Sequence, residues 1–141
     1  MNHERGAQSG ETAGPMTGLS HVQLRVADVT VSAGWYAAAL GLQPFQADPA
    51  IGYVALRHQE SGVVIVLTTD TSASKRGDTG ALDHLAFAVP DGAILEAWAD
   101  HLRSVGIDHA GVVRENGNPS LQLRDPDGTA VELVAPRPRR G

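Results

Sequence analysis

Residues 19–42 read LSHVQLRVADVTVSAGWYAAALGL, and residues 82–105 read LDHLAFAVPDGAILEAWADHLRSV. The two stretches align without a gap at a constant offset of 63 residues. The identical pairs are Leu19/Leu82, His21/His84, Val26/Val89, Asp28/Asp91 and Trp35/Trp98. A chance match would not keep a strand pattern, a capping residue and a helix pattern in phase, so we interpret the chain as an internal duplication.

Each copy predicts a strand followed by a helix. Apolar residues alternate with other residues over Leu19–Val26 and Leu82–Val89, the period of a strand with one buried face. Asp28 and Asp91 are predicted to cap the helices, because a short carboxylate accepts hydrogen bonds from the free N–H groups of the first turn. The predicted apolar stripes are Val31, Trp35 and Ala38 or Ala39 in the first helix, and Ile94, Trp98, Leu102 and Val105 in the second.

Three further strands are predicted in each copy. They are Gln43–Ala47, Ile51–His58 and Gly62–Thr69 in the first, and Asp108–Arg114, Pro119–Arg124 and Thr129–Ala135 in the second. The predicted fold class is α+β, with two tandem βαβββ modules forming a curved, cup-shaped mixed sheet whose outer face carries the helices. The predicted modules are residues 18–70 and 82–136, joined by a linker (71–81) and flanked by flexible tails (1–17 and 137–141).

The composition excludes several classes of function. The chain has 141 residues, a formal net charge of -5, 4% aromatic residues and no cysteine. Nucleic-acid binding is disfavoured by the negative charge and the few rings, and the missing cysteine excludes disulfides and thiolate metal sites. No apolar run could span a bilayer, and the N-terminus lacks the apolar core of a secretory signal. We therefore expect a cytoplasmic protein that binds neither nucleic acid nor membrane.

Strand alternation places three metal-ligating side chains on one face. The helices must cover the apolar face of the sheet, so the helix-free face carries His21, His84 and Glu132. Two neutral imidazoles and one carboxylate, with open coordination positions, suit Fe(II) and related divalent ions. Two alternatives stay open: the histidines are structural remnants of the duplication, and Glu132 pairs with Arg124 or Arg57 across the sheet.

Other side chains on the helix-free face are predicted to handle a small-molecule substrate. We predict catalytic roles for Gln122, Tyr53 and Arg124, and substrate contacts for Gln23, Arg57 and Val66. The remaining histidines, His3, His58, His101 and His109, are predicted to be exposed or structural. Alternation places Asp83 on the opposite face from His84, and Asp125 and Asp127 are predicted to belong to a turn.

Three stretches resemble the vicinal oxygen chelate superfamily: the first strands LSHVQLRV and LDHLAFAV, and the closing LRDPDGTAVELVAP. That superfamily includes glyoxalase I, extradiol dioxygenases, methylmalonyl-CoA epimerase, fosfomycin-resistance thiol transferases and bleomycin-resistance proteins. The resemblance covers residues 19–136. It implies that His21, His84 and Glu132 bind a divalent metal ion: Fe(II), Mn(II), Zn(II) or Ni(II).

The resemblance also implies a kind of chemistry. Val66 stands where glyoxalase I usually has a carboxylate and epimerases have an amide or carboxylate, and Gln122 stands where dioxygenases and fosfomycin enzymes commonly have tyrosine. The ligand set favours dioxygenase-like chemistry on a small oxygenated substrate. The alternatives are a metal-dependent lyase or isomerase, a fosfomycin-type thiol transferase, and a non-catalytic sequestering protein. In that superfamily the cup closes either within one chain or across a swapped dimer. We predict a homodimer, because two short modules leave strand edges that need covering, and in such a dimer His21 of one chain can meet His84 and Glu132 of the other.

Overall fold

The computed structural model describes residues 13–69, 82–114 and 117–137.

The first sheet is built from four strands. The first sheet contains β1 (Val22–Val26), β2 (Gln43–Asp48), β3 (Tyr53–Arg57) and β4 (Val64–Thr69), in the order β1-β4-β3-β2. β1 is parallel to β4 and the other pairs are antiparallel, while a short 3-10 helix, η1 (Pro49–Ile51), joins β2 to β3.

The second sheet repeats this pattern with three strands. It contains β5 (His84–Ala88), β6 (Ser120–Arg124) and β7 (Ala130–Val134) in the order β5-β7-β6, and β5 is parallel to β7. The predicted class and the mixed pairing are confirmed, although the strands described form two sheets.

The strand predicted over Asp108–Arg114 is wrong. In that stretch Val113 alone makes a bridge, to Ser120. The segment instead runs beside helix α3 (Gly92–Ser104), because the His109 Nε2–H donates a hydrogen bond to the carbonyl of Ala99 in that helix at 3.0 Å. Gly111 then turns the backbone with a φ of 95°.

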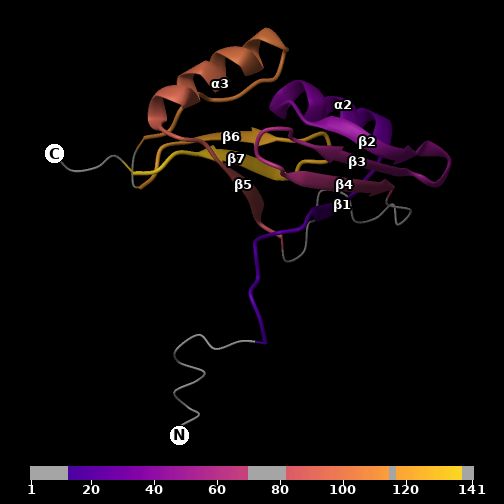
Figure 1. The fold of residues 1–141 in the computed structure, drawn as a ribbon. Helices are drawn as coiled ribbons and strands as arrows, with labels where there is room; N and C mark the ends of the chain where they lie inside the picture. Colours follow the sequence, from indigo (N-terminus) through magenta and orange to yellow (C-terminus); the bar gives the residue numbers. More distant parts are fainter. Residues whose placement is uncertain (1–12, 70–81, 115–116, 138–141) are drawn as a thin grey trace, which may run out of the picture.

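Both helices lie on one side of the sheets, as Figure 1 shows. Helix α2 (Val29–Leu40) begins at Asp28, whose carboxylate accepts from the N–H groups of Thr30 and Val31. Helix α3 begins at Asp91, whose carboxylate accepts from the N–H of Ile94 at 3.0 Å. Both predicted caps are confirmed.

The predicted apolar stripes are confirmed at Ala39 and Leu102, and at the other positions along the helices the buried residue is displaced by about one. The buried face of α2 carries Val29, Ser32, Tyr36, Ala39 and Leu40, and that of α3 carries Leu95, Ala99 and Leu102. Val31 and Val105 are exposed, and Ile94 is just over a third exposed. The two tryptophans stay half-buried beside these faces, because a large ring can pack at the margin of a core without being enclosed by it.

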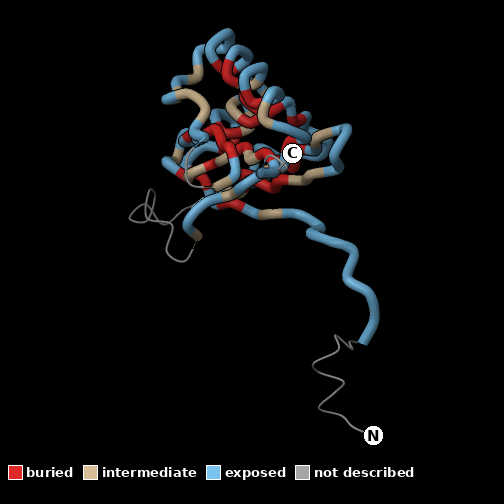
Figure 2. The backbone as a smooth tube through the Cα atoms, turned by 90° about the vertical axis from the view of Figure 1, so that its left-hand side faces the viewer, coloured by how far each residue is buried: buried red, intermediate tan, exposed pale blue. Residues whose placement is uncertain are grey.

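One hydrophobic core lies between the helices and the sheets. Figure 2 shows the buried backbone concentrated between these layers. The predicted helix-facing residues Leu24, Val26, Val89, Val131 and Leu133 are all in this core, with Val22, Leu85 and Phe87 packed against it. The predicted alternation is therefore confirmed in the first strand of each module and in the last strand of the second module.

A buried hydrogen bond joins the two modules. The predicted turn after β6 forms, and the carboxylate of Asp125 accepts from the N–H groups of Asp127 and Thr129. Its other oxygen accepts from the hydroxyl of Tyr36 in α2 at 2.7 Å. Burial, and then the charge of Asp125, raise the pKa of Tyr36 well above its usual range, so the phenol keeps the proton that it donates.

Parts of the predicted organisation fall outside the described residues. These are the linker over 71–81, residues 1–12 of the N-terminal tail and residues 138–141 of the C-terminal tail. In the ranges that are described, no helix is long and apolar enough to cross a membrane.

Replacing Tyr36 with Phe is expected to lower the free energy of unfolding by about 1–3 kcal/mol, because it leaves a buried oxygen of Asp125 without its donor. Urea denaturation measures the change. The matched control is Tyr53→Phe on half-buried Tyr53, which we expect to change stability by less than about 0.5 kcal/mol. Equal losses in both variants would contradict the assignment.

Candidate metal centre

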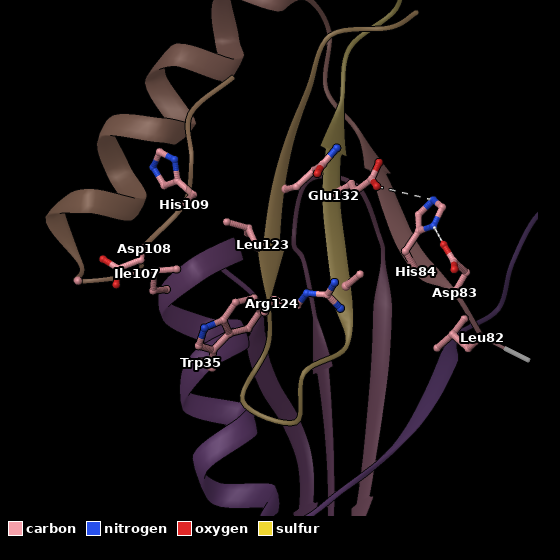
Figure 3. Close-up of a pocket in the computed structure, with 13 residues that line it drawn as sticks. Trp35, Leu82, Asp83, His84, Ile107, Asp108, His109, Leu123, Arg124 and Glu132 are labelled. Carbon is pink, nitrogen blue, oxygen red and sulfur yellow. Dashed lines mark hydrogen bonds and ion pairs between the residues drawn. The ribbon is translucent and has the colours of Figure 1, made fainter. Parts of the chain in front are cut away.

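Two of the predicted metal ligands lie together on the second sheet. His84 is the first residue of β5, and Glu132 is the middle residue of β7. The register pairs His84 with Ala130 and Ala86 with Glu132. The side chains of His84 and Glu132 therefore lie on neighbouring strands of the helix-free face, two residues apart in the register. His84 Nε2 is 4.0 Å from Glu132 Oε2 (Figure 3), and both side chains are partly exposed.

Asp83 orients the imidazole of His84. The His84 Nδ1–H donates to the Asp83 carboxylate at 2.8 Å, which leaves Nε2 directed at Glu132 (Figure 3). The prediction that Asp83 faces away from His84 is wrong, because residue 83 precedes the strand and strand alternation does not hold there. The Asp83 hydrogen bond, and then the charge of Glu132, raise the pKa of His84. These acidic neighbours favour a positive charge at this position.

A cavity of about 970 Å³ opens over these residues. Gln122 and Arg124, two of the predicted catalytic residues, line it together with His84 and Glu132. Gln122 faces Glu132 in the β6–β7 register, and the Arg124 guanidinium donates to the carbonyl of Gly128 at 2.9 Å.

Several residues that line this cavity were not predicted. Among them, Trp35, Ile107, Asp108 and His109 lie on the other side of β6 from His84 in Figure 3. Asp108 and His109 belong to the segment that was predicted as a strand and instead runs beside α3, and Ile107 directly precedes that segment. The repeat could have drawn attention to Trp35, which is one of the identical pairs.

His21 lies apart from the other two predicted ligands in this chain. It lines a different cavity, of about 480 Å³, whose walls include Val64, Phe87 and Trp98. In the ranges 13–69, 82–114 and 117–137, no three His, Cys, Asp or Glu side chains come close enough to hold one metal ion. The Ser20 hydroxyl lies 2.9 Å from His21 Nδ1, so the residue before each histidine bonds the same ring nitrogen in both modules.

The first sheet carries the remaining predicted catalytic residue, Tyr53, and the three predicted substrate-binding residues. Gln23 faces Val66 across β1 and β4, as Ala86 faces Glu132 across β5 and β7, so Val66 occupies the position of Glu132 in the first module. Tyr53 and Arg57 come from β3. None of these four residues lines the cavity of His84.

The other described histidines are structural or exposed, as predicted. The ring of His58 contacts the Ser61 hydroxyl at 2.8 Å within a turn. The His101 Nε2–H donates to the carbonyl of Ala38 at 2.8 Å, and the ring of His109 is bonded to Ala99. His3 lies outside the described residues.

The fold and the donor pair define a class of two-module proteins with a helix-free face open to small ligands. The family model described as Glyoxalase/Bleomycin resistance protein/Dioxygenase superfamily matches residues 18–133. The chain belongs to this superfamily, which confirms the predicted resemblance.

Individual proteins of this class are similar to the chain. A Vibrio parahaemolyticus protein named "Probable lactoylglutathione lyase" is 26% identical over 125 residues, covering 82% of this chain and 88% of its own. A glyoxylase/bleomycin resistance protein/dioxygenase domain from Frankia sp. EAN1pec has the same fold, with a TM-score of 0.75, 24% identity, and coverage of 87% of this chain and 100% of that one.

A third similar protein was solved with a metal ion. It is a variant of the fosfomycin resistance protein FosX from Listeria monocytogenes in complex with Mn(II) and 1S,2S-dihydroxypropylphosphonic acid. It shares the fold at a TM-score of 0.67 and 17% identity, with coverage of 86% of this chain and 92% of that one.

Replacing Asp83 with Ala is expected to lower Mn(II) affinity about tenfold or more, because a carboxylate behind a ligating histidine fixes its ring and raises its basicity. Calorimetric titration of the purified protein measures the affinity. The matched control is Asp100→Ala, which removes an exposed carboxylate that pairs with Arg103 on α3. Unchanged Mn(II) affinity in the Asp83 variant would refute the orienting role.

Proposed function

We propose that the protein is a metal-dependent enzyme acting on a small oxygenated substrate. His84 and Glu132 supply two ligands from one chain, and His21 of a second chain supplies the third. The observation that supports this most is the convergence of His84 Nε2 and Glu132 Oε2 at 4.0 Å on an open face. An imidazole nitrogen and a carboxylate oxygen suit Mn(II), Fe(II), Ni(II) and Zn(II).

A homodimer accounts for the position of His21. β1 and β5 stand at the ends of their sheets, so each has an unpaired edge among the described strands. The smaller cavity lies beside both strands, since Val22 of β1 and Ala86 of β5 line it. Unpaired edges favour association with another chain. A second copy brought to these edges would carry its own His21 to the pair formed by His84 and Glu132.

Dioxygenase-like chemistry is the reaction we propose first. Three protein ligands leave positions at which a bound metal ion can accept two substrate oxygens and stabilise developing negative charge. Val66 supports a count of three protein ligands. It occupies the position in the first module that Glu132 occupies in the second, and its apolar side chain cannot bind a metal ion. Lyase or isomerase chemistry and thiol transfer use the same chelation, and a substrate screen separates them.

The chain's own polar groups would orient the substrate. Gln122 faces Glu132 across β6 and β7, so its amide can donate to a substrate oxygen next to the ligands. Arg124 lies on the same face, and its bond to the Gly128 carbonyl fixes the guanidinium. Tyr53 and Gln23 lie on the first sheet, so they would reach the substrate from the chain that donates His21.

Metal binding tests the proposal. Wild-type protein is expected to bind one equivalent of Mn(II) per chain and to melt at a higher temperature with the ion. His84→Ala is expected to lose both effects, because it removes one of three ligands. His101→Gln is the matched control, since this histidine bonds a backbone carbonyl on the helix side. A wild-type protein that neither contains metal nor responds to Mn(II), Fe(II), Ni(II) or Zn(II) would contradict the proposal and favour a sequestering protein.

The Mn(II)- and Fe(II)-loaded proteins are then screened with catechols, with hemithioacetals of glutathione and with fosfomycin plus a thiol. Oxygen consumption with a catechol supports dioxygenase-like chemistry. Turnover of another substrate class would contradict that assignment and leave the metal centre in place.

A further inference from the structure

The arginines of the sheets differ from those of the helix side. Arg103 pairs with Asp100 at 3.1 Å, and Arg114 pairs with Glu96 at 2.9 Å. Arg57 forms no ion pair with any residue that the structure describes, and it is exposed at the end of β3. An exposed arginine without an ion pair is available for an anionic ligand.

Arg57 occupies a defined position relative to a predicted metal ligand. Arg57 is paired with Val64 across β3 and β4. His21 directly precedes Val22, which is paired with Ile65, so His21 lies level with Val64. His21 and Val64 also line the same cavity. Arg57 is therefore two strands from His21, or about 10 Å at the usual strand spacing.

The second module repeats this arrangement. Arg124 faces Ala130, and Ala130 faces His84, so an arginine again lies two strands from a predicted metal ligand. Arg124 already donates to the carbonyl of Gly128. Arg57 has no hydrogen bond of this kind to a described residue, so of the two it keeps more N–H donors for a ligand.

Phe45 holds the Arg57 guanidinium in place without occupying its donors. The Arg57 Cζ lies 4.1 Å from the centre of the Phe45 ring. Phe45 stands at a bulge of β2, where the register shifts between Pro44 and Gln46. A cation on a ring face keeps its N–H groups directed outward in its own plane. Asp48 is the one acidic residue of the described strands of this sheet. It lies opposite Tyr53 in the β2–β3 register, at the other end of β3 from Arg57.

We propose that the substrate carries an oxyanion, a carboxylate or a phosphonate, which Arg57 binds while the vicinal oxygens reach the metal centre. This inference rests on the proposed function. Since His21 directly precedes β1 and Arg57 ends β3 of the same sheet, the chain that donates His21 also donates the anion contact. The guanidinium fork matches both oxyanions in geometry, and probes with different anionic groups distinguish them.

Three probes with one chelating head test the inference: 4-methylcatechol, 3,4-dihydroxybenzoate and 3,4-dihydroxyphenylphosphonate. Calorimetry on the Mn(II)-loaded protein measures their affinities. We expect wild-type protein to bind at least one of the anionic probes about tenfold or more tightly than 4-methylcatechol. Arg57→Met is expected to abolish this preference, so that the anionic probes bind no more tightly than 4-methylcatechol, and Arg57→Lys is expected to retain part of it. Arg103→Met is the control that keeps the full preference.

The outcomes separate this inference from the proposed function. Equal binding of all three probes, or a preference that survives in Arg57→Met, would overturn the anion site while the metal centre stands. A protein that binds no Mn(II) would overturn the proposed function and the anion site with it. The anionic probe that binds with the higher affinity identifies the anionic group of the substrate as a carboxylate or a phosphonate.

Discussion

The parallel pairing of β5 with β7 fixes the relative positions of the two donors on which the candidate site depends. Because Ala86 faces Glu132 and His84 faces Ala130, the imidazole and the carboxylate project from neighbouring strands on the same face. A shift of the register by one residue would turn Glu132 toward the helices and bury its charge. The core residues Val131 and Leu133, on either side of Glu132, oppose such a shift, since both would have to leave the core.

The first module uses the same pairing for a different purpose. Gln23 faces Val66 where Ala86 faces Glu132, so the duplicated fold holds a carboxylate in one module and an apolar residue in the other. The first module keeps the histidine and, in Arg57, a cation held by an aromatic ring. The second keeps His84 with Asp83 behind it. This division explains why each module alone has an incomplete set of the proposed metal ligands.

Much of the fold could be predicted because the repeat, the helix caps and the strand alternation are local properties of the sequence. The capping residues Asp28 and Asp91 and the core-facing positions of β7 follow from such patterns. Contacts between distant segments could not be predicted in this way. The hydrogen bond from Tyr36 to Asp125 joins residues 89 apart, and it places Tyr36 rather than Trp35 on the buried face of α2.

The candidate site shows the same limit. His84, Glu132, Gln122 and Arg124 were predicted to share a face and they line one cavity, because alternation within regular strands determines both. The contact between Asp83 and His84 was missed, since it forms where the strand begins. Whether His21 joins the other ligands depends on how two modules or two chains meet, which no local pattern encodes.

If two chains share the metal centre, mixing two variants that each lack a different ligand restores it. His21→Ala and Glu132→Gln are each expected to bind little Mn(II), measured by the loss of the free-ion signal in electron paramagnetic resonance. After joint unfolding and refolding, dimers with one chain of each variant contain one intact site, formed by His21 of one chain with His84 and Glu132 of the other. We expect the mixture to regain Mn(II) binding at about a quarter of its sites, because random pairing makes about half of the dimers mixed and each mixed dimer has one intact site of two. A mixture that binds no more Mn(II) than the separate variants would contradict it.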